Sequence, residues 1–456
     1  MKRTSRHSSQ AARRRRTSEG GGLLVTAMLL AAIIGVALVS YLSLGRTTLK
    51  LSHRTFFAND AGNLAEAGIE EALYSFNLMG TGASAATAWT GWTASGTNAS
   101  RTLAPFNRDQ NAIGTVKVYA KGYDGSDNAP YIVSQATITP FDGSAPIVRT
   151  VQVTLRRVEG ATANGLVALN GLSIGGSAFA DSFNSNPTNS PTGPWASYSS
   201  GIARSKTTVI VMAGSISAGS GAIKGDLKLG KGVVAPSSSV YSGTLTTNYN
   251  ATFPYPVVPT AASVSQSYSL GASIPANLPR AGDVAASDGR FYYFCSGATI
   301  GALAITSGRN VSIVGSGGTS MTSGLAIKSL ATCFIFMDGP MTLTKGNDIS
   351  NLAWAGGLQI CTTTTSTCYI GNKSTFVGCL FAPFAPLNLT GGASSSMIIG
   401  SVVAKTVIET AGMDFHYDET LLASNPSTGF GVFIWREFQT AAERATVGAL
   451  TNNFLP

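Results

Sequence analysis

The densest group of side chains that could do chemistry lies in the run MDFHYDETL. Asp414, His416 and Asp418 occupy alternate positions there, so a β-strand would place all three on one face. A histidine between two carboxylates could bind a metal ion or act as an acid–base pair in cleaving a polysaccharide. Such an enzyme needs further charged residues on neighbouring strands, and the surrounding sequence is almost uncharged. We therefore treat these residues as a weak candidate cluster and favour a structural role.

A second acidic residue, Asp181 in FADSFNS, could also be catalytic. A turn in which its carboxylate accepts a hydrogen bond from nearby backbone is the simpler interpretation. The sequence contains no nucleotide-binding loop, nucleophile elbow, zinc-protease helix or calcium loop. It predicts no catalytic residue, no metal and no cofactor, and hence a protein that is not an enzyme.

The composition indicates the class of protein that carries these residues. Of 456 residues, only 53 are charged (31 Lys and Arg, 22 Asp and Glu), whereas 52 are glycine. Disordered chains and coiled coils are richer in charge, so the composition favours a β-rich exported protein. The formal net charge of +9 comes mostly from one short tail, which argues against nucleic acid as a partner. Its seven cations are Lys2, Arg3, Arg6, Arg13, Arg14, Arg15 and Arg16.

An uncharged segment follows that basic leader of residues 1–22. Residues 23–44, LLVTAMLLAAIIGVALVSYLSL, would form a helix of about 33 Å, enough to cross a bilayer. A cleavable secretory signal has a shorter apolar core. Because cations stay on the cytoplasmic side, we predict a single-pass inner-membrane anchor with the N-terminus inside and the bulk exported to the periplasm or cell surface. Ala27, Ala31 and Gly35 form a small-residue stripe that would suit helix packing, although such residues are common in membrane helices.

The helical pattern continues beyond the lipid boundary over residues 45–80. Apolar residues recur at three- and four-residue spacing, with most of the charges off that stripe. One continuous helix from about 23 to 78 is predicted, ended by Gly80 and Gly82. The stripe consists of Leu49, Phe56, Phe57, Ala61, Leu64, Ala65, Gly68, Ala72, Leu73 and Phe76.

This N-terminus resembles that of type IV pilins over about residues 13–78. A basic tail, a glycine-marked boundary, an apolar helix and the continuation AEAGIEEAL carry the resemblance, and the arrangement is similar to PilX-type minor pilins and the K-type minor pseudopilin of type II secretion. The resemblance implies cutting by a prepilin peptidase after Gly20, Gly21 or Gly22, of which we favour Gly21, and methylation. Other pilin or pseudopilin subunits, the peptidase and inner-membrane lipid are the implied partners. Major pilins carry Glu at the fifth mature position; Thr26 stands there instead, which favours a minor or tip subunit.

The exported part reads as two β-rich units. Residues 85–112 are expected to form a loop. Three alternating runs between 116 and 155 predict an antiparallel meander on the long helix, so that 85–158 forms a pilin-like head. Residues 165–422 alternate short apolar runs with small-residue turns, typical of a parallel β-solenoid of about 20–25 residues per turn. A β-sandwich is the alternative. Residues 235–280, rich in Ser, Thr and Pro, are expected to form a long excursion, and 423–456 a C-terminal cap on the last turn.

Five cysteines lie in this region. Cys295, Cys333 and Cys379 stand inside apolar runs and are expected to be buried thiols. Cys361 and Cys368 bracket TTTTST, which predicts a hairpin loop closed by a disulfide in an oxidising compartment. Two free thiols in a loop are the alternative.

The predicted fold is α+β and mainly β: a long transmembrane helix on a small antiparallel sheet, then a parallel β-solenoid. The segments GGSAFADSFNS and GSVVAKTVIETAGMDFHYDETL resemble the β-helical adhesin-like domains that follow PilX-type N-termini. The resemblance implies a membrane-anchored assembly protein whose head binds a surface or a carbohydrate. A membrane-tethered β-helix enzyme acting on polysaccharide is the alternative, and an anchored scaffold that is never processed is a third.

Overall fold

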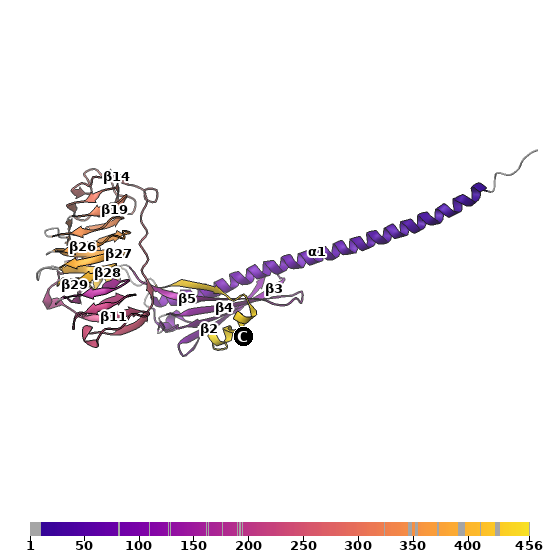
Figure 1. The fold of residues 1–456 in the computed structure, drawn as a ribbon, viewed down its shortest axis with the longest axis horizontal. Helices are drawn as coiled ribbons and strands as arrows, with labels where there is room; N and C mark the ends of the chain where they lie inside the picture. Colours follow the sequence, from indigo (N-terminus) through magenta and orange to yellow (C-terminus); the bar gives the residue numbers. More distant parts are fainter. Residues whose placement is uncertain are drawn as a thin grey trace, which may run out of the picture.

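The computed structural model describes residues 11–455, apart from short gaps. These gaps are 81–82, 109, 126, 128, 161, 163, 176, 189, 191–192, 194, 323, 345–348, 352–353, 372–373, 391–396, 411 and 425–428. Figure 1 shows a long helix, a small head at its C-terminal end, and a tall stack of strands beside that head.

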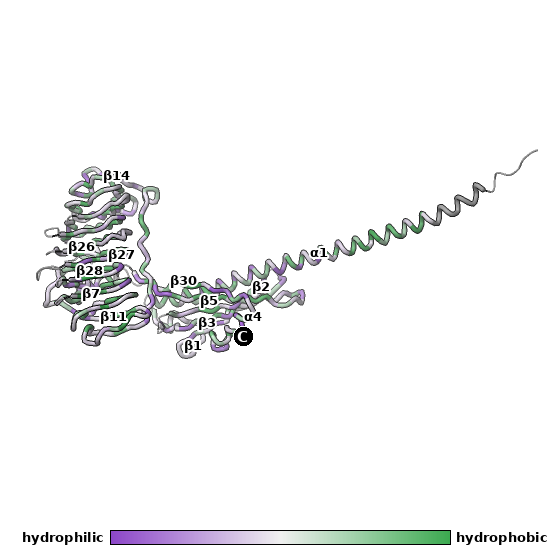
Figure 2. Tube along the Cα trace, viewed as in Figure 1, coloured by the Kyte–Doolittle hydropathy of each residue, from purple (hydrophilic) through white to green (hydrophobic). Residues whose placement is uncertain are grey.

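The predicted continuous helix is confirmed, and α1 runs unbroken over Ala11–Gly80. Its 70 residues correspond to about 105 Å. The second half packs on the head, whereas the apolar stretch after Gly22 has no contact with the rest of the chain and colours as a hydrophobic rod in Figure 2. Burial begins at Phe57, so the predicted stripe starts too early: Leu49 and Phe56 are exposed because they lie before the sheet. The buried residues of α1 are Phe57, Ala61, Leu64, Ala65, Ile69, Ala72 and Phe76.

The head contains the predicted antiparallel meander. Alternation buries one face of the sheet under α1, and Gly68 permits the closest approach, because a Cβ there would collide with Ser134, Val116 and Val118. The expected loop at 85–112 is wrong in part. Pairing with β3 holds Asn98–Arg108 as strand β2, although its sequence is polar and its register shifts between Leu103 and Phe106. The elements are α2 (Ala85–Ala88), β1 (Thr93–Ser95), β2 (Asn98–Arg108), β3 (Ala112–Lys121), β4 (Tyr131–Pro140) and β5 (Ile147–Val158).

The second unit is a parallel β-solenoid with three walls around one apolar core. Successive partners along the first wall are residues 291, 311, 333 and 358, so the turns contain 20, 22 and 25 residues. This matches the predicted length of a turn. Short 3₁₀ turns also occur, at η1 (Ser200–Ile202), η2 (Ser238–Val240) and η3 (Ala355–Gly357).

The strands of each wall follow from their pairing. The first wall contains β6 (Leu166–Ala168), β9 (Thr207–Val211), β11 (Gly225–Gly230), β12 (Leu245–Tyr249), β14 (Tyr268–Gly271), β16 (Arg290–Ser296), β19 (Asn310–Ser316), β22 (Thr332–Met337), β25 (Leu358–Thr362) and the centres of β27 (Thr375–Thr390) and β28 (Met397–Glu409). The second contains β8 (Ala180–Phe183), β15 (Asn277–Leu278), β18 (Leu303–Ile305), β21 (Leu325–Ile327), β24 (Ile349–Asn351) and β29 (Asp414–Asp418), and the third β7 (Leu172–Ile174), β10 (Ile216–Ala218), β17 (Thr299–Ile300), β20 (Ser320–Met321), β23 (Thr342–Leu343) and β26 (Cys368–Gly371).

The order of turns along the solenoid differs from their order in the chain. Strand β28 pairs with β27 on one side and with β6 on the other, so residues near 402 lie beside residues near 166. The first wall therefore reads β14, β16, β19, β22, β25, β27, β28, β6, β9, β11, β12. The chain enters the stack in its middle, winds to one end, crosses to the other end and winds back to the middle.

A strap makes that crossing. Strand β13 (Ala251–Thr252) first pairs with β5 of the head, and residues 253–267, all of them described, then form no strand, as Pro254, Pro256 and Pro259 predict. Figure 1 shows the strap running along the outside of the stack toward β14. It packs Phe253 and Tyr255 on an outer apolar strip of the first wall.

The predicted C-terminal cap on the solenoid is wrong. Strand β30 (Gly429–Glu437) instead pairs antiparallel with β5, from Gly429 opposite Val158 to Glu437 opposite Val151. The helices α4 (Ala441–Ala445) and α5 (Val447–Leu450) follow, and Phe438, Val447 and Leu455 pack on Val133 of the head. The solenoid, which ends at α3 (Thr420–Ser424), is therefore inserted between two adjacent strands of the head sheet.

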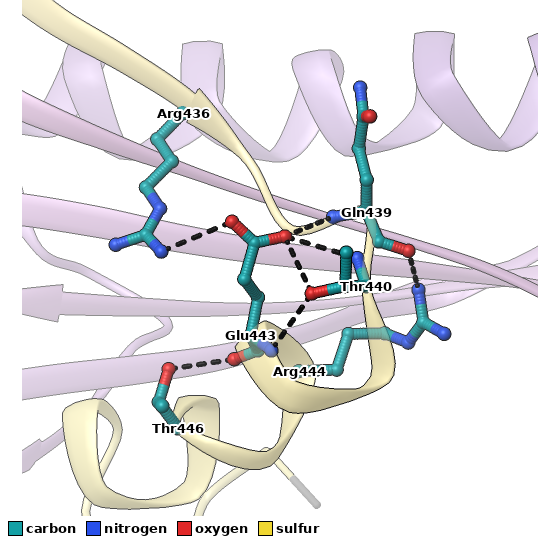
Figure 3. Close-up of polar contacts among 6 residues, drawn as sticks. All are labelled: Arg436, Gln439, Thr440, Glu443, Arg444 and Thr446. Carbon is teal, nitrogen blue, oxygen red and sulfur yellow. Dashed lines mark hydrogen bonds and ion pairs between the residues drawn. The ribbon is translucent and has the colours of Figure 1, made fainter.

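Hydrogen bonds within the C-terminal segment hold the start of α4 against the end of β30 (Figure 3). The Thr440 hydroxyl accepts a bond from the backbone N–H of Glu443, and the Glu443 carboxylate accepts one from the backbone N–H of Thr440. Arg436 of β30 lies 3.3 Å from the same carboxylate. Hydrogen bonds from Thr440, and then from Arg436, lower the pKa of Glu443 to about 2.

Candidate functional site

The weak candidate cluster lies where two distant chain segments stack in the second wall. Strand β29 pairs with β8, and His416 stands directly opposite Asp181. The His416 Nδ1 and Asp181 Oδ1 atoms are 2.6 Å apart. Both side chains are buried, with 1% and 0% of their surface exposed. Since Phe415 and Tyr417 point into the solenoid core, this pair lies on the outer side of the wall.

An aromatic layer covers the pair. The Tyr198 ring stacks on the His416 ring at 3.4 Å and 17°, and its hydroxyl donates to Asp181 Oδ2 at 2.9 Å. Burial, and then the hydrogen bond to Asp181, raise the pKa of Tyr198 well above its ordinary value, so the phenol remains a donor. At the rim, Lys224 Nζ lies 3.9 Å from Asp181 Oδ2 and 3.7 Å from the Phe179 ring.

The other two members of the cluster have partners of their own. Asp418 accepts bonds from the backbone N–H and the hydroxyl of Ser185, the latter at 2.7 Å. Asp414 accepts from the backbone N–H of Phe179 at 3.2 Å. Burial raises the pKa of both carboxyl groups. Each acid therefore ties its strand to a loop, and the three residues do not converge on one point.

This geometry supports a structural role better than a catalytic one. Asp181, His416 and Asp418 are hydrogen-bonded and almost fully buried, so a polymer substrate has no route to them. Within the described part of the chain, no group of three or more His, Cys, Asp or Glu side chains could hold a metal ion. The expectation of a turn at Asp181 is wrong, because the residue lies inside β8. Its pairing with His416 depends on the stacking of turns, for which a single run of sequence carries no signal.

The predicted Cys361–Cys368 disulfide is absent, and all five cysteines are free and buried. Alternation in β25 turns Cys361 outward, into the strip beside Phe381, whereas Cys368 points into the solenoid core. Cys361 thus faces outward from the first wall, whereas Cys368 faces inward from the third. Burial raises the pKa of Cys333, Cys361 and Cys379 to about 12, so these thiols stay protonated and unreactive.

The anchor region is the second candidate site. Among the described residues one helix, Gly22–Met79 of α1, is long and apolar enough to cross a membrane, and its most apolar window is fully exposed. The expected cleavage position at Gly21 and Gly22 lies within α1. At Gly22 and Gly35 no other part of the chain comes within 4 Å of an added Cβ, so both positions are open to a partner.

Comparison with known proteins gives two findings. The model of a family described as a domain of unknown function, DUF7305, matches residues 257–424. The crystal structure of the competence-associated pilin ComZ from Thermus thermophilus aligns with a TM-score of 0.26 and 14% sequence identity, over 83% of this chain and 97% of that one. No curated protein matches the sequence.

Proposed function

We propose that this chain is a membrane-anchored subunit of a pilus-like assembly and resembles a PilX-type minor pilin. Its inserted solenoid is exported and binds a surface ligand. One observation carries the proposal. A single helix is buried against its own sheet from Phe57 onward, yet leaves its apolar first half without any contact.

Such a helix needs either lipid or other helices around it. The exposed apolar residues extend from Leu23 to Leu44, the length of a bilayer core. In the membrane this segment anchors the subunit, and in a filament the same surface packs against the helices of neighbouring subunits. The stripe of Ala27, Ala31 and Gly35, exposed along its whole length, allows close approach in either setting.

Insertion between β5 and β30 suits a binding role for the solenoid. The head sheet keeps its helix, while the inserted unit stands at the end of the head away from the anchor (Figure 1). A ligand held by the solenoid or at its base would therefore be presented far from the membrane. We assign binding rather than catalysis, because Asp414, His416 and Asp418 each hydrogen-bond to a neighbouring segment of the solenoid.

The test is the N-terminus of the mature protein, measured by mass spectrometry in cells with and without prepilin peptidase. We expect a new N-terminus at Gly21, Gly22 or Leu23 that depends on the peptidase. A variant with Gly20→Leu, Gly21→Leu and Gly22→Leu should keep its leader. Gly45→Leu is the matched control, since it changes an open glycine of the same helix and should be processed normally. An uncut leader in both strains would refute the pilin assignment.

A further inference from the structure

A cavity lies at the junction of the head and the solenoid. Its volume is about 670 Å³, within the range of small-molecule sites. The head contributes Thr97, Asp127 and Arg156, and the solenoid contributes Lys231, Asn248 and Asn250. Both units therefore form its walls, and its lining is rich in hydrogen-bonding groups.

Arg156 is the unusual residue of this cavity. It lies on β5, and its guanidinium stacks on the Phe433 ring of β30 at 3.3 Å. Its Nε atom is buried without a hydrogen-bond partner. Among the residues that the structure describes, no carboxylate pairs with Arg156. A stacked, partly desolvated guanidinium with free donors is prepared to bind a planar anion through two parallel hydrogen bonds.

The remaining charges of the cavity agree with a single anionic group. Lys231, from the solenoid, is the second cation of the lining. The Asp127 carboxylate is already compensated by Lys121, at 3.6 Å. A nucleic acid needs a row of cations along its phosphates, and the lining of this cavity offers two.

The uncharged polar groups of the lining indicate the class of ligand that carries the anionic group. The side-chain amides of Asn248 and Asn250 have no hydrogen-bond partner within the described part of the chain, and Thr97 contributes a hydroxyl. Amide groups that both donate and accept suit a ligand with many hydroxyls. Tyr249 forms the floor and is fixed there, because its hydroxyl donates to the buried carboxylate of Glu159.

From this geometry we infer that the cavity binds an acidic saccharide, with a sugar carboxylate on Arg156 and hydroxyl groups on the asparagines. The inference deepens the binding role proposed above, since it names the site and the ligand class. It needs neither leader cleavage nor filament assembly, so the two can fail separately.

The experiment measures binding to the full chain in detergent micelles by calorimetry. The probes are tri-galacturonate, its methyl ester, sodium phosphate and a single-stranded oligonucleotide. We expect the uronide to bind and the ester, which lacks only the charge, to bind about ten- to a hundredfold more weakly. Arg156→Gln should weaken uronide binding by a similar factor, and Lys231→Gln by a smaller one.

Arg309→Gln is the matched control, because it removes an arginine near an aromatic ring, Phe291, far from the cavity. Its affinity should equal that of the unaltered chain. If Arg156→Gln does not fold, Lys231→Gln, whose side chain is exposed, still tests the site. Three results would overturn the inference: no uronide binding at millimolar concentration, equal binding of uronide and ester, or tighter binding of phosphate or oligonucleotide. Processing of the leader should be unaffected in all three variants.

Discussion

Replacing Asp181 by alanine should destabilise the solenoid locally around the His416 pair. The substitution removes the acceptor of the Tyr198 hydroxyl and the partner of His416 Nδ1, at 2.9 and 2.6 Å. The buried His416 ring would be left without its partner, and the half-buried Tyr198 hydroxyl would lose its acceptor.

The size of the effect follows from these contacts. Leaving the buried imidazole of His416 without its hydrogen-bond partner costs about 1–3 kcal/mol, and loss of the hydrogen bond from Tyr198 adds about 1 kcal/mol. Asp181→Asn preserves the shape and one acceptor oxygen, so we expect a loss of only about 1–2 kcal/mol. Asp226→Ala is the matched control, since that exposed carboxylate accepts one backbone bond, from Thr244 at 2.7 Å, and should change stability by less than about 0.5 kcal/mol.

The assay must report on this region, because the head and the solenoid can unfold separately. Hydrogen exchange read by mass spectrometry over β8, β29 and the segment around Tyr198 gives the local free energy of opening. We expect faster exchange there for Asp181→Ala and unchanged exchange in the head. If Asp181→Ala lowered the local free energy of opening by less than about 1 kcal/mol, or slowed exchange, the Asp181–His416 pair would not stabilise the second wall.

Three further predictions concern packing, the junction and pH. Gly400→Ala should abolish cooperative unfolding of the solenoid in a denaturant titration, with a loss of unfolding free energy above about 4 kcal/mol. Gly400 has φ of +131°, and an added Cβ would collide with the Gly378 carbonyl oxygen. Gly301→Ala, where the added Cβ would lie in open space, should leave the titration unchanged. Tyr249→Phe removes a hydrogen bond to the buried Glu159 carboxylate and should lower the free energy of unfolding by about 1.5–3 kcal/mol in chemical denaturation. The Tyr292 hydroxyl donates to the more exposed Asp288, so Tyr292→Phe should lower it by less than about 1 kcal/mol. Since burial raises the pKa of Asp418, the folded chain holds that proton more tightly than the unfolded chain, so this residue's contribution to stability decreases as the pH rises from the ordinary Asp value through the raised one. Unfolding curves at a series of pH values should therefore show that the free energy of unfolding decreases less with rising pH for Asp418→Asn than for the unaltered chain. An equal decrease in the two proteins would contradict a raised pKa at Asp418.

The elements that depend on local pattern could be predicted from the sequence. The spacing of Leu64, Ala72 and Phe76 marks the buried face of α1, and alternation in residues 116–155 marks the meander. Short apolar runs separated by glycine indicate the solenoid, because each turn repeats the same inward-facing positions.

The errors that concern the solenoid and the C-terminal segment involve contacts between distant segments. Nothing in GFGVFIWRE shows that it pairs with β5, because an apolar strand suits a cap and a sheet edge equally well. The spacing of Cys361 and Cys368 suits a disulfide, and only the course of β25 and β26 shows that the thiols face opposite sides. Asp181 and His416 meet through the pairing of β8 with β29, two strands that lie at opposite ends of the inserted unit's sequence.

The permuted order of the solenoid has a consequence for biosynthesis. During vectorial synthesis β6 emerges early, but its neighbour β28 emerges only after nearly the whole inserted unit. The head sheet likewise lacks β30 until the last residues are released. Both units thus expose unpaired strand edges until these late strands have been made, the condition in which chains aggregate or recruit chaperones. A chain truncated before Met397 would lack both β28 and β30 and would complete neither unit, whereas one truncated before Gly429 would lack the last strand of the head sheet. Folding of the head sheet therefore depends on a strand that follows the whole inserted unit.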